Sequence, residues 1–242
     1  MKKTAVITGA SRGIGRACAI ELAKHFENIV INSLHHPEDL EQTKAEIEKL
    51  GATCLIQSGD VGSYSFVSSM IEETIRSFSS IDLLVNNAGI SYIGLLTDMS
   101  IQDWNQVITT NLTSVFNCCR HVIPHMVRRK SGHIINISSM WGLNGASCEA
   151  AYSAAKGGVN ALTQALAKEL APSNIRVNAL ACGAIDTQMN KAFTQEELTT
   201  LCEDIPIGRL GQPEEVALMI WQLYNSPSYL TGEIIKIDGG YL

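Results

Sequence analysis

Features that mark secreted, membrane and nucleic-acid-binding proteins are scarce in this sequence. Its first apolar run, Ala5–Ile7, is three residues long and ends at a glycine-rich turn, so we expect neither a signal peptide nor a membrane span. Its 18 basic side chains are outnumbered by 24 acidic ones, and the net charge of −6 argues against binding to the phosphates of nucleic acids. We therefore expect no nucleic-acid partner and no membrane partner.

The seven cysteines form no C-x-x-C pair, and their odd number leaves one thiol unpaired by count. Because no export signal precedes them, we expect reduced thiols in a cytoplasmic protein. No set of cysteine, histidine or carboxylate side chains stands at the spacing of metal ligands, so we expect no metal site.

Short β-branched runs alternate with longer stretches of helical period, and this pattern is typical of a parallel sheet built from βαβ units. The expected strands are Thr4–Thr8, Ile29–Asn32, Thr53–Gln57, Leu83–Asn86, His133–Ser138, Arg176–Ala179 and Glu233–Ile237. The expected helices are 14–25, 38–50, 65–78, 103–128, 153–171 and 213–225. With 242 residues and 45% hydrophobic content, the chain is predicted to form one α/β domain over 1–242, a Rossmann-type doubly wound parallel sheet of about seven strands with helices on both faces.

A glycine pattern, Gly9-x-x-x-Gly13-x-Gly15, joins the first expected strand to the first expected helix. Residues without side chains let the backbone turn tightly and approach a pyrophosphate, which the helix N-terminus then binds through its N–H groups and dipole. The alternative is a tight turn that packs a helix and binds no ligand. The position between strand and helix favours a dinucleotide site.

The end of the second expected strand bears on the choice of dinucleotide. A carboxylate there would bind the adenosine ribose and repel a 2′-phosphate, but the segment reads Asn32-Ser33-Leu34-His35-His36. Arg12, inside the glycine turn, is able to present a guanidinium group to a phosphate. NADPH is therefore favoured over NADH; the alternative makes Arg12 a solvated surface charge.

A tyrosine and a lysine, Tyr152 and Lys156, stand four residues apart in a helical stretch, and Ser139 lies thirteen positions upstream of the tyrosine. Residues i and i+4 share one face of a helix, so the ammonium is expected to lie near the phenol and to lower its pKa. A phenol with a lowered pKa is a plausible proton-transfer group. The same spacing also arises by chance on amphipathic helices.

Together these motifs resemble the classical short-chain dehydrogenase/reductase family over the whole chain. The resemblance implies catalytic roles for Asn111, Ser139, Tyr152 and Lys156. It implies cofactor contacts for Gly9, Ser11, Arg12, Gly13, Ile14, Gly15, Asp60, Val61, Asn87, Ala88, Gly89, Tyr152, Lys156, Ile185 and Thr187. By the same resemblance, Tyr152 protonates a carbonyl oxygen that Ser139 also binds, and Asn111 anchors a water that links Lys156 to solvent.

Within this family the chain is most similar to the bacterial reductases of 3-oxoacyl groups held on acyl carrier protein. That resemblance implies a homotetramer, a substrate lid near 187–204, and docking of the acidic carrier protein at Arg128 and Arg129. The structural alternative is that these arginines complement the dipole of their own helix.

Some positions depart from the common pattern: Trp141, the pair Cys148-Glu149, and Cys182-Gly183 where the family commonly has Pro-Gly. These departures keep an alternative function open, that of the elongation factor P 5-aminopentanone reductase, a relative that reduces a ketone on a modified lysine. Reductases of other small ketones, steroids or sugars form a broader alternative. A non-catalytic NADP-binding regulator is a further one, although such a protein is expected to lose Tyr152 or Lys156.

Overall fold

The computed structural model describes residues 2–189 and 194–242 and contains one sheet of seven strands, all parallel, in the order β3-β2-β1-β4-β5-β6-β7. The strands are β1 (Thr4–Ile7), β2 (Asn28–Ser33), β3 (Thr53–Ser58), β4 (Leu83–Asn86), β5 (Gly132–Ser139), β6 (Ile175–Cys182) and β7 (Ile234–Ile237). The prediction of a doubly wound parallel sheet is confirmed.

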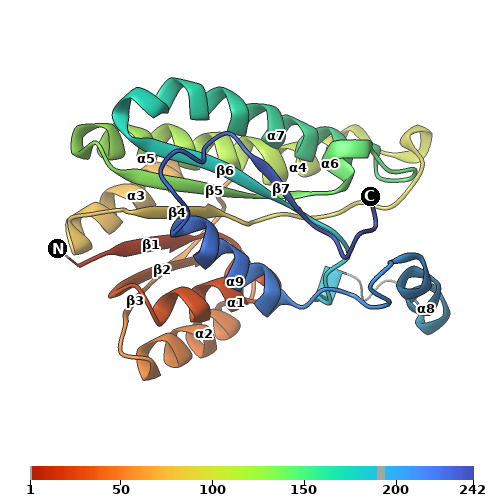
Figure 1. Ribbon diagram of the computed structural model, residues 1–242, viewed down its shortest axis with the longest axis horizontal. Coiled ribbons are helices and arrows are strands. Elements are labelled where there is room, and N and C mark those ends of the chain that lie inside the picture. The colour runs from red at the N-terminus through yellow and green to blue at the C-terminus, as the bar shows by residue number, and fades with distance from the viewer. Residues whose placement is uncertain (1, 190–193) are drawn as a thin grey trace.

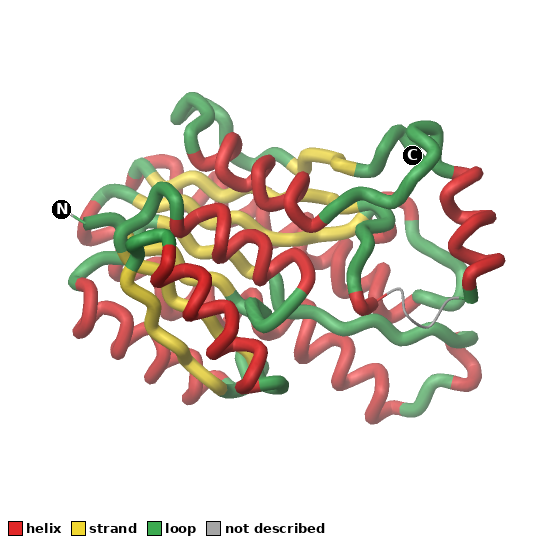
Figure 2. Tube along the Cα trace, turned by 90° about the horizontal axis from the view of Figure 1, so that it is seen from below, coloured by secondary structure: helices red, strands yellow, loops and turns green. Residues whose placement is uncertain are grey.

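Helices cover both faces of this sheet. They are α1 (Gly13–Ala23), α2 (Pro37–Lys49), α3 (Tyr64–Phe78), α4 (Ile101–Ile108), α5 (Ser114–Arg129), α6 (Trp141–Asn144), α7 (Ala150–Leu170), α8 (Gln195–Asp204) and α9 (Pro213–Tyr224), with 3-10 turns at Leu96–Asp98 and Ala171–Ser173. Figure 1 shows α5 and α7 on one side of the sheet and α1, α2 and α9 on the other. Figure 2, turned by 90°, shows the strands as one layer among these helices.

Successive side chains of a strand point in opposite directions, so a strand of consecutive apolar residues makes both faces of the sheet apolar. In β5, Ile135 and Ile137 join the core beneath α1, α2 and α9, whereas Ile134 joins the core beneath α3, α5 and α7. Both cores are buried, and because all the strands are parallel, their carboxyl ends lie along one edge of the sheet.

The expected single helix over 103–128 was wrong in one respect, since a π-helical segment, Thr109–Thr113, separates α4 from α5. The side-chain amide of Asn111 donates hydrogen bonds to the carbonyl oxygens of Val107 (2.9 Å) and Ile90 (2.9 Å). An amide that binds the carbonyl four residues earlier competes with the ordinary helical ladder, and π segments of this kind recur at functional sites.

Gly15 is the tightest point of the junction between β1 and α1. A Cβ atom placed there would lie 2.2 Å from the carbonyl oxygen of Gly9 and 2.5 Å from Nδ2 of Asn87. We expect Gly15→Ala to lower the free energy of unfolding by about 1 to 3 kcal/mol, which is the usual cost of overpacking. Denaturant titration of the variant and the parent protein measures this difference.

The control for this prediction is Gly157→Ala in α7, where the added methyl would meet only the Gly142 carbonyl oxygen at 3.5 Å. That variant should keep or slightly raise stability, because alanine is the better helix former. Equal stability of Gly15→Ala and the parent protein would show that the turn relaxes freely.

Candidate active site

The glycine turn between β1 and α1 is built to receive an anion. Gly9 and Gly13 have φ values of 65° and 55°, in the left-handed region that favours glycine. Arg12 occupies the N-cap of α1, and its guanidinium, which only donates hydrogen bonds, cannot cap the N–H groups of the first turn. The N–H groups of that turn therefore have no side-chain cap, which fits the phosphates of a dinucleotide.

A second strand fixes the shape of this turn. The Asn87 amide, just beyond β4, donates to the carbonyl oxygens of Thr8 (2.9 Å) and Gly9 (3.1 Å), and the Thr8 hydroxyl accepts from the N–H groups of Asn87 and Ala88 at 3.0 Å each. Because the strand order reverses between β1 and β4, their carboxyl ends open a crevice of the kind that binds ligands in doubly wound folds.

A cavity of about 950 Å³ occupies this crevice and gathers almost all the predicted site residues. Its lining includes Gly9, Ser11, Arg12, Gly13, Ile14, Asp60, Val61, Asn87, Ala88, Gly89, Ser139, Tyr152, Lys156, Ile185 and Thr187. The remaining two, Gly15 and Asn111, are buried behind it. Residues far apart in the sequence thus meet in one space that is large enough for a dinucleotide and a small substrate.

The two adjacent serines at the end of β5 differ in their partners. The Ser138 hydroxyl donates to Oδ1 of Asn160 at 2.6 Å. The Ser139 hydroxyl oxygen accepts from the N–H group of Trp141 at 3.1 Å and also makes a side-chain hydrogen bond with Tyr152. Ser139, as predicted from the sequence, is therefore the serine that stands beside the phenol.

Lys156 lies almost wholly inside the protein, with 4% of its surface exposed. Its ammonium donates to the carbonyl oxygen of Ile137 in β5 at 2.8 Å and lies 5.6 Å from the centre of the Tyr152 ring. Burial lowers the pKa of Lys156 from 10.5 to about 8, and the neighbouring Cys182 thiol opposes that shift.

The expected effect of this lysine on the tyrosine was wrong. Burial raises the pKa of Tyr152 well above its ordinary value, and the hydrogen bond with Ser139 only partly offsets the rise. The nearby carboxylate of Glu149 raises the pKa of the phenol further. The spacing alone could not reveal this, because desolvation depends on everything that packs around the ring.

Asn111 is completely buried beside this group. Besides the two hydrogen bonds that its amide donates, its Oδ1 accepts from the N–H group of Ile90 at 3.2 Å. A Cβ atom on Gly89 would lie 2.7 Å from Oδ1 of Asn111 and 3.6 Å from Nζ of Lys156, so glycine is required where the three residues converge. The predicted water between Asn111 and Lys156 stays a prediction.

At the opposite end of the cavity, basic and polar groups gather after β2. The Arg12 guanidinium donates to Oε1 of Gln188 at 2.8 Å and lies 3.3 Å from Nε2 of His36. The Ser11 and Ser33 hydroxyls are 3.2 Å apart. Gln188 was missed by the sequence analysis, since it comes from the loop after β6 and only the fold brings it to Arg12.

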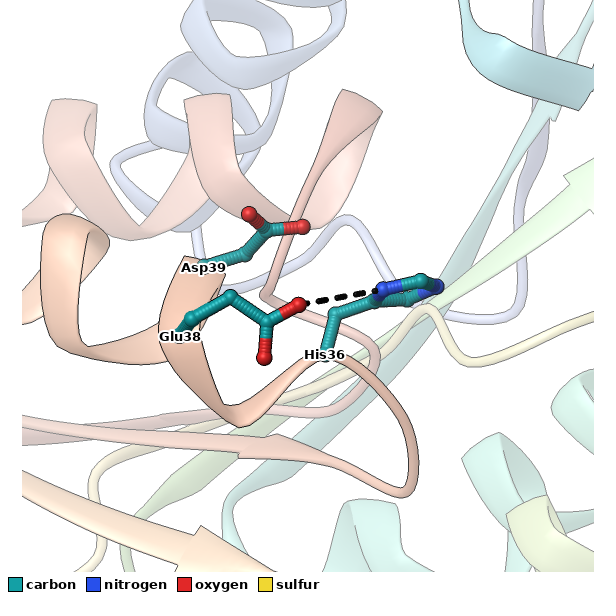
Figure 3. A group of neighbouring side chains, drawn as sticks. All are labelled: His36, Glu38 and Asp39. Atoms are coloured by element: carbon teal, nitrogen blue, oxygen red, sulfur yellow. Dashed lines mark ion pairs between the residues drawn. The ribbon is translucent and has the colours of Figure 1, made fainter.

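The expectation that no histidine and carboxylate set stands at ligand spacing was also wrong. Nitrogen and oxygen atoms of His36, Glu38 and Asp39 all lie within 4.8 Å of one another (Figure 3). Nδ1 of His36 is 3.5 Å from Oε1 of Glu38 (Figure 3). The group sits on the surface beside the Arg12 guanidinium, whose positive charge disfavours a cation, so we assign it no metal.

Cys182 takes the place where a proline is common in the family. Its side chain is buried and lines the cavity, and burial raises the pKa of its thiol to about 12. A thiol that stays protonated is a poor nucleophile. Of the two alternatives for this residue, a small buried side chain fits the structure better than a reactive thiol.

Only part of the predicted carrier-protein surface is free. The Arg129 guanidinium forms an ion pair with Asp82 at 2.9 Å and donates to the carbonyl oxygen of Ile81, whereas Arg128 is exposed. Arg129 thus anchors the end of α5 to the loop before β4.

Across residues 2–189 and 194–242, no helix is long and apolar enough to span a membrane.

The buried ammonium predicts a measurable pH dependence of stability. Between pH 8 and 10.5 the unfolded state keeps the proton on this lysine while the folded state has lost it, so the free energy of unfolding rises with pH in that window. Relative to Lys156→Met, the parent protein should gain on the order of 3 kcal/mol across it. Denaturant titrations of both proteins at several pH values test this, and a constant difference would contradict the buried, shifted lysine.

Comparisons with known proteins agree with the fold. A family model described as short chain dehydrogenase matches residues 3–198. A 3-oxoacyl-[acyl-carrier-protein] reductase FabG of Staphylococcus aureus is 41% identical over 241 residues, covering 99% of this chain and 98% of that protein. Proteins of the same name from Staphylococcus epidermidis and Chlamydia muridarum are 40% and 38% identical, each covering 99% of this chain, and the match covers 99% and 97% of their own lengths. The chain belongs to the short-chain dehydrogenase/reductase family and is an oxidoreductase that acts on carbonyl or hydroxyl groups.

Proposed function

We propose that this protein is an NADPH-dependent reductase of 3-oxoacyl groups carried on acyl carrier protein. The observation that carries the proposal is the meeting of Ser139, Tyr152 and Lys156 in the same cavity as the glycine turn. The similar proteins named 3-oxoacyl-[acyl-carrier-protein] reductase support the choice of substrate.

A bound nicotinamide dinucleotide would supply the hydride for such a reduction. As negative charge builds on the carbonyl oxygen, the Ser139 and Tyr152 hydroxyls donate hydrogen bonds to it, and Tyr152 gives up its proton. The raised pKa of Tyr152 keeps the phenol protonated at neutral pH, the form that a reductase needs before each turnover. The Lys156 ammonium holds positive charge beneath the forming phenolate, and Asn111 fixes the backbone around it.

The preference for NADPH rests on the residues after β2. A 2′-phosphate bound there would meet Arg12, Ser33 and His36, all of which line the cavity. The first carboxylate of this segment, Glu38, is turned toward His36 (Figure 3). Guanidinium groups bind phosphate strongly, and a carboxylate directed at the ribose would oppose it.

We also propose a substrate lid, a homotetramer and a docking residue for the carrier protein. Met189 and Leu201, which also line the cavity, support a lid over 187–204; residues 190–193 lie outside the described part of the chain. The exposed apolar ring of Phe116 on α5 supports the homotetramer. Arg128 is the arginine that we retain for carrier docking. The one-domain organisation and the cytoplasmic location also stay predictions.

A second candidate function is reduction of a ketone on a modified lysine of elongation factor P. One observation favours it: Trp141, Glu149 and Cys182, which depart from the common family pattern, line the same cavity as Tyr152. Departures that gather around the substrate, and leave the glycine turn unchanged, indicate a change in the molecule that is reduced.

A competition of substrates at equal NADPH tests these functions. Carrier-bound 3-oxoacyl groups, modified elongation factor P and small ketones are compared by kcat/KM, and we expect the carrier-bound substrate to give the highest value. A higher kcat/KM for modified elongation factor P would assign the second function, and no turnover of any carbonyl would favour a regulator.

Tyr152→Phe should lower kcat by roughly 10²- to 10⁴-fold while NADPH binding stays nearly unchanged.

The cofactor preference has its own test. Arg12→Ala should raise the KM for NADPH by roughly 10- to 150-fold, because a charged hydrogen bond contributes about 1.5 to 3 kcal/mol, while the KM for NADH changes little. Arg16→Ala is the matched control, since that guanidinium pairs with Glu46 at 2.6 Å and does not line the cofactor cavity. Equal losses with both cofactors would remove the NADPH assignment.

A further inference from the structure

One carboxylate in the substrate end of the cavity has no role in the chemistry described above except to raise the pKa of Tyr152. Glu149 precedes the first turn of α7 and occupies its N-cap, but its side chain makes no cap hydrogen bond. Instead, Oε2 of Glu149 accepts a hydrogen bond from the Ser91 hydroxyl at 2.9 Å. Both residues line the cavity that contains Tyr152. The carboxylate is thus directed to the cavity and away from its own helix.

The electrostatic surroundings of this carboxylate are incomplete. The ion pairs of the described residues do not include Glu149, and Ser91 is the side chain that hydrogen-bonds it. Burial raises the pKa of Glu149, while the Ser91 hydroxyl opposes that rise. A partly buried carboxylate without a cation costs free energy, and a positively charged ligand would recover it.

The position of Glu149 also restricts where such a cation would lie. The N–H group of Ser153 donates to the Glu149 carbonyl oxygen at 2.8 Å, so Glu149 and Tyr152 belong to one turn at the start of α7. The carboxylate is near enough to raise the pKa of the Tyr152 phenol. When the carbonyl oxygen of a ketone binds Tyr152, the part of the molecule that reaches Glu149 is therefore only a few bonds from that carbonyl.

The other walls at this end are largely apolar. Ile90, Ile93, Trp141, Met189 and Leu201 line the cavity around the two polar residues. A hydrocarbon linker fits such walls, and one charged group at a fixed place then orients the ligand. A neutral acyl chain alone would leave the Glu149 carboxylate with the Ser91 hydroxyl and no cation.

We propose that Glu149 and Ser91 form a subsite for a protonated amine, and that the protein reduces ketones that carry such an amine in preference to neutral ketones of the same shape. The inference rests on the proposed carbonyl reduction and adds a substrate class to it. The amine keeps its proton and donates an N⁺–H···O⁻ hydrogen bond to Glu149. The hydride of NADPH goes to the carbonyl carbon and the Tyr152 proton to the oxygen, which gives an amino alcohol and NADP⁺.

Two isosteric ketones test this directly. One is a methyl ketone that ends in a dimethylamino group after three methylenes; the other ends in an isopropyl group and is neutral. A tertiary amine cannot condense with its own carbonyl. The parent protein should show a kcat/KM for the amino ketone at least tenfold above that for its isostere, and Glu149→Gln should remove most of this ratio.

The controls separate charge from shape. Gln keeps the size of Glu149 and its ability to accept from Ser91, so a lost ratio reports the charge. Glu169→Gln removes an exposed carboxylate from the same helix and should leave the ratio unchanged. The ratio should also fall as the pH is lowered and Glu149 becomes protonated. A ratio near one in the parent protein, or an unchanged ratio in Glu149→Gln, would overturn the subsite.

Failure of the proposed function has a different signature. If no carbonyl is reduced, including a 3-oxoacyl thioester, binding of N,N-dimethylpentylamine and of its isopropyl isostere to the NADP-loaded protein is measured by calorimetry. Tighter binding of the amine that Glu149→Gln abolishes would support the subsite even then. Equal binding of the two molecules would refute it.

Discussion

Burial of one ammonium group constrains the whole catalytic end of this fold. The Lys156 ammonium loses most of its hydration and donates a hydrogen bond to the carbonyl oxygen of Ile137. This bond fixes the position of α7 along β5. Gly142 allows that approach, since a Cβ atom on it would lie 2.7 Å from the Lys156 backbone. Besides the catalytic role that we propose for it, Lys156 therefore has a structural role, and the position of Tyr152, one turn earlier, follows from it.

The parallel sheet supplies the second half of this arrangement. Because all seven strands run in one direction, Thr8, Asn87 and Ser139 follow or end neighbouring strands at the same edge. The glycine turn, the amide that fixes it and the serine beside Tyr152 reach one cavity without any long loop. An oxidoreductase needs cofactor and substrate in contact, and this edge brings the two sets of residues together before either ligand binds.

The sequence predicted what depends on local pattern and missed what depends on distant contacts. The strands and the glycine turn are local, so the strands were predicted in their order along the chain. Their bounds differ by at most one residue, except at the end of β6, which extends to Cys182 and not to Ala179. The π segment was not predicted, because the Asn111 amide that competes with the helical ladder at Val107 is also held by Ile90, 21 positions away. The raised pKa of Tyr152 depends on burial, and the pairing of Arg129 with Asp82 joins residues 47 positions apart. Site residue types were thus easier to predict than their electrostatics.

Two side chains of opposite charge, Arg12 and Glu149, line different parts of the cavity, and their placement bears on what the protein accepts. Arg12 lies at the end after β2, where an anionic phosphate gains from it, and Glu149 lies at the end beside Tyr152. A substrate with a positive charge near its carbonyl is thereby attracted to the catalytic end, and an anionic one is repelled from it. A carrier-bound acyl chain is neutral near its carbonyl and gains nothing from this difference. With the proposed Glu149 subsite, the charge of the molecule close to the reacting carbon would be the property by which this cavity discriminates between substrates that share the same hydride chemistry.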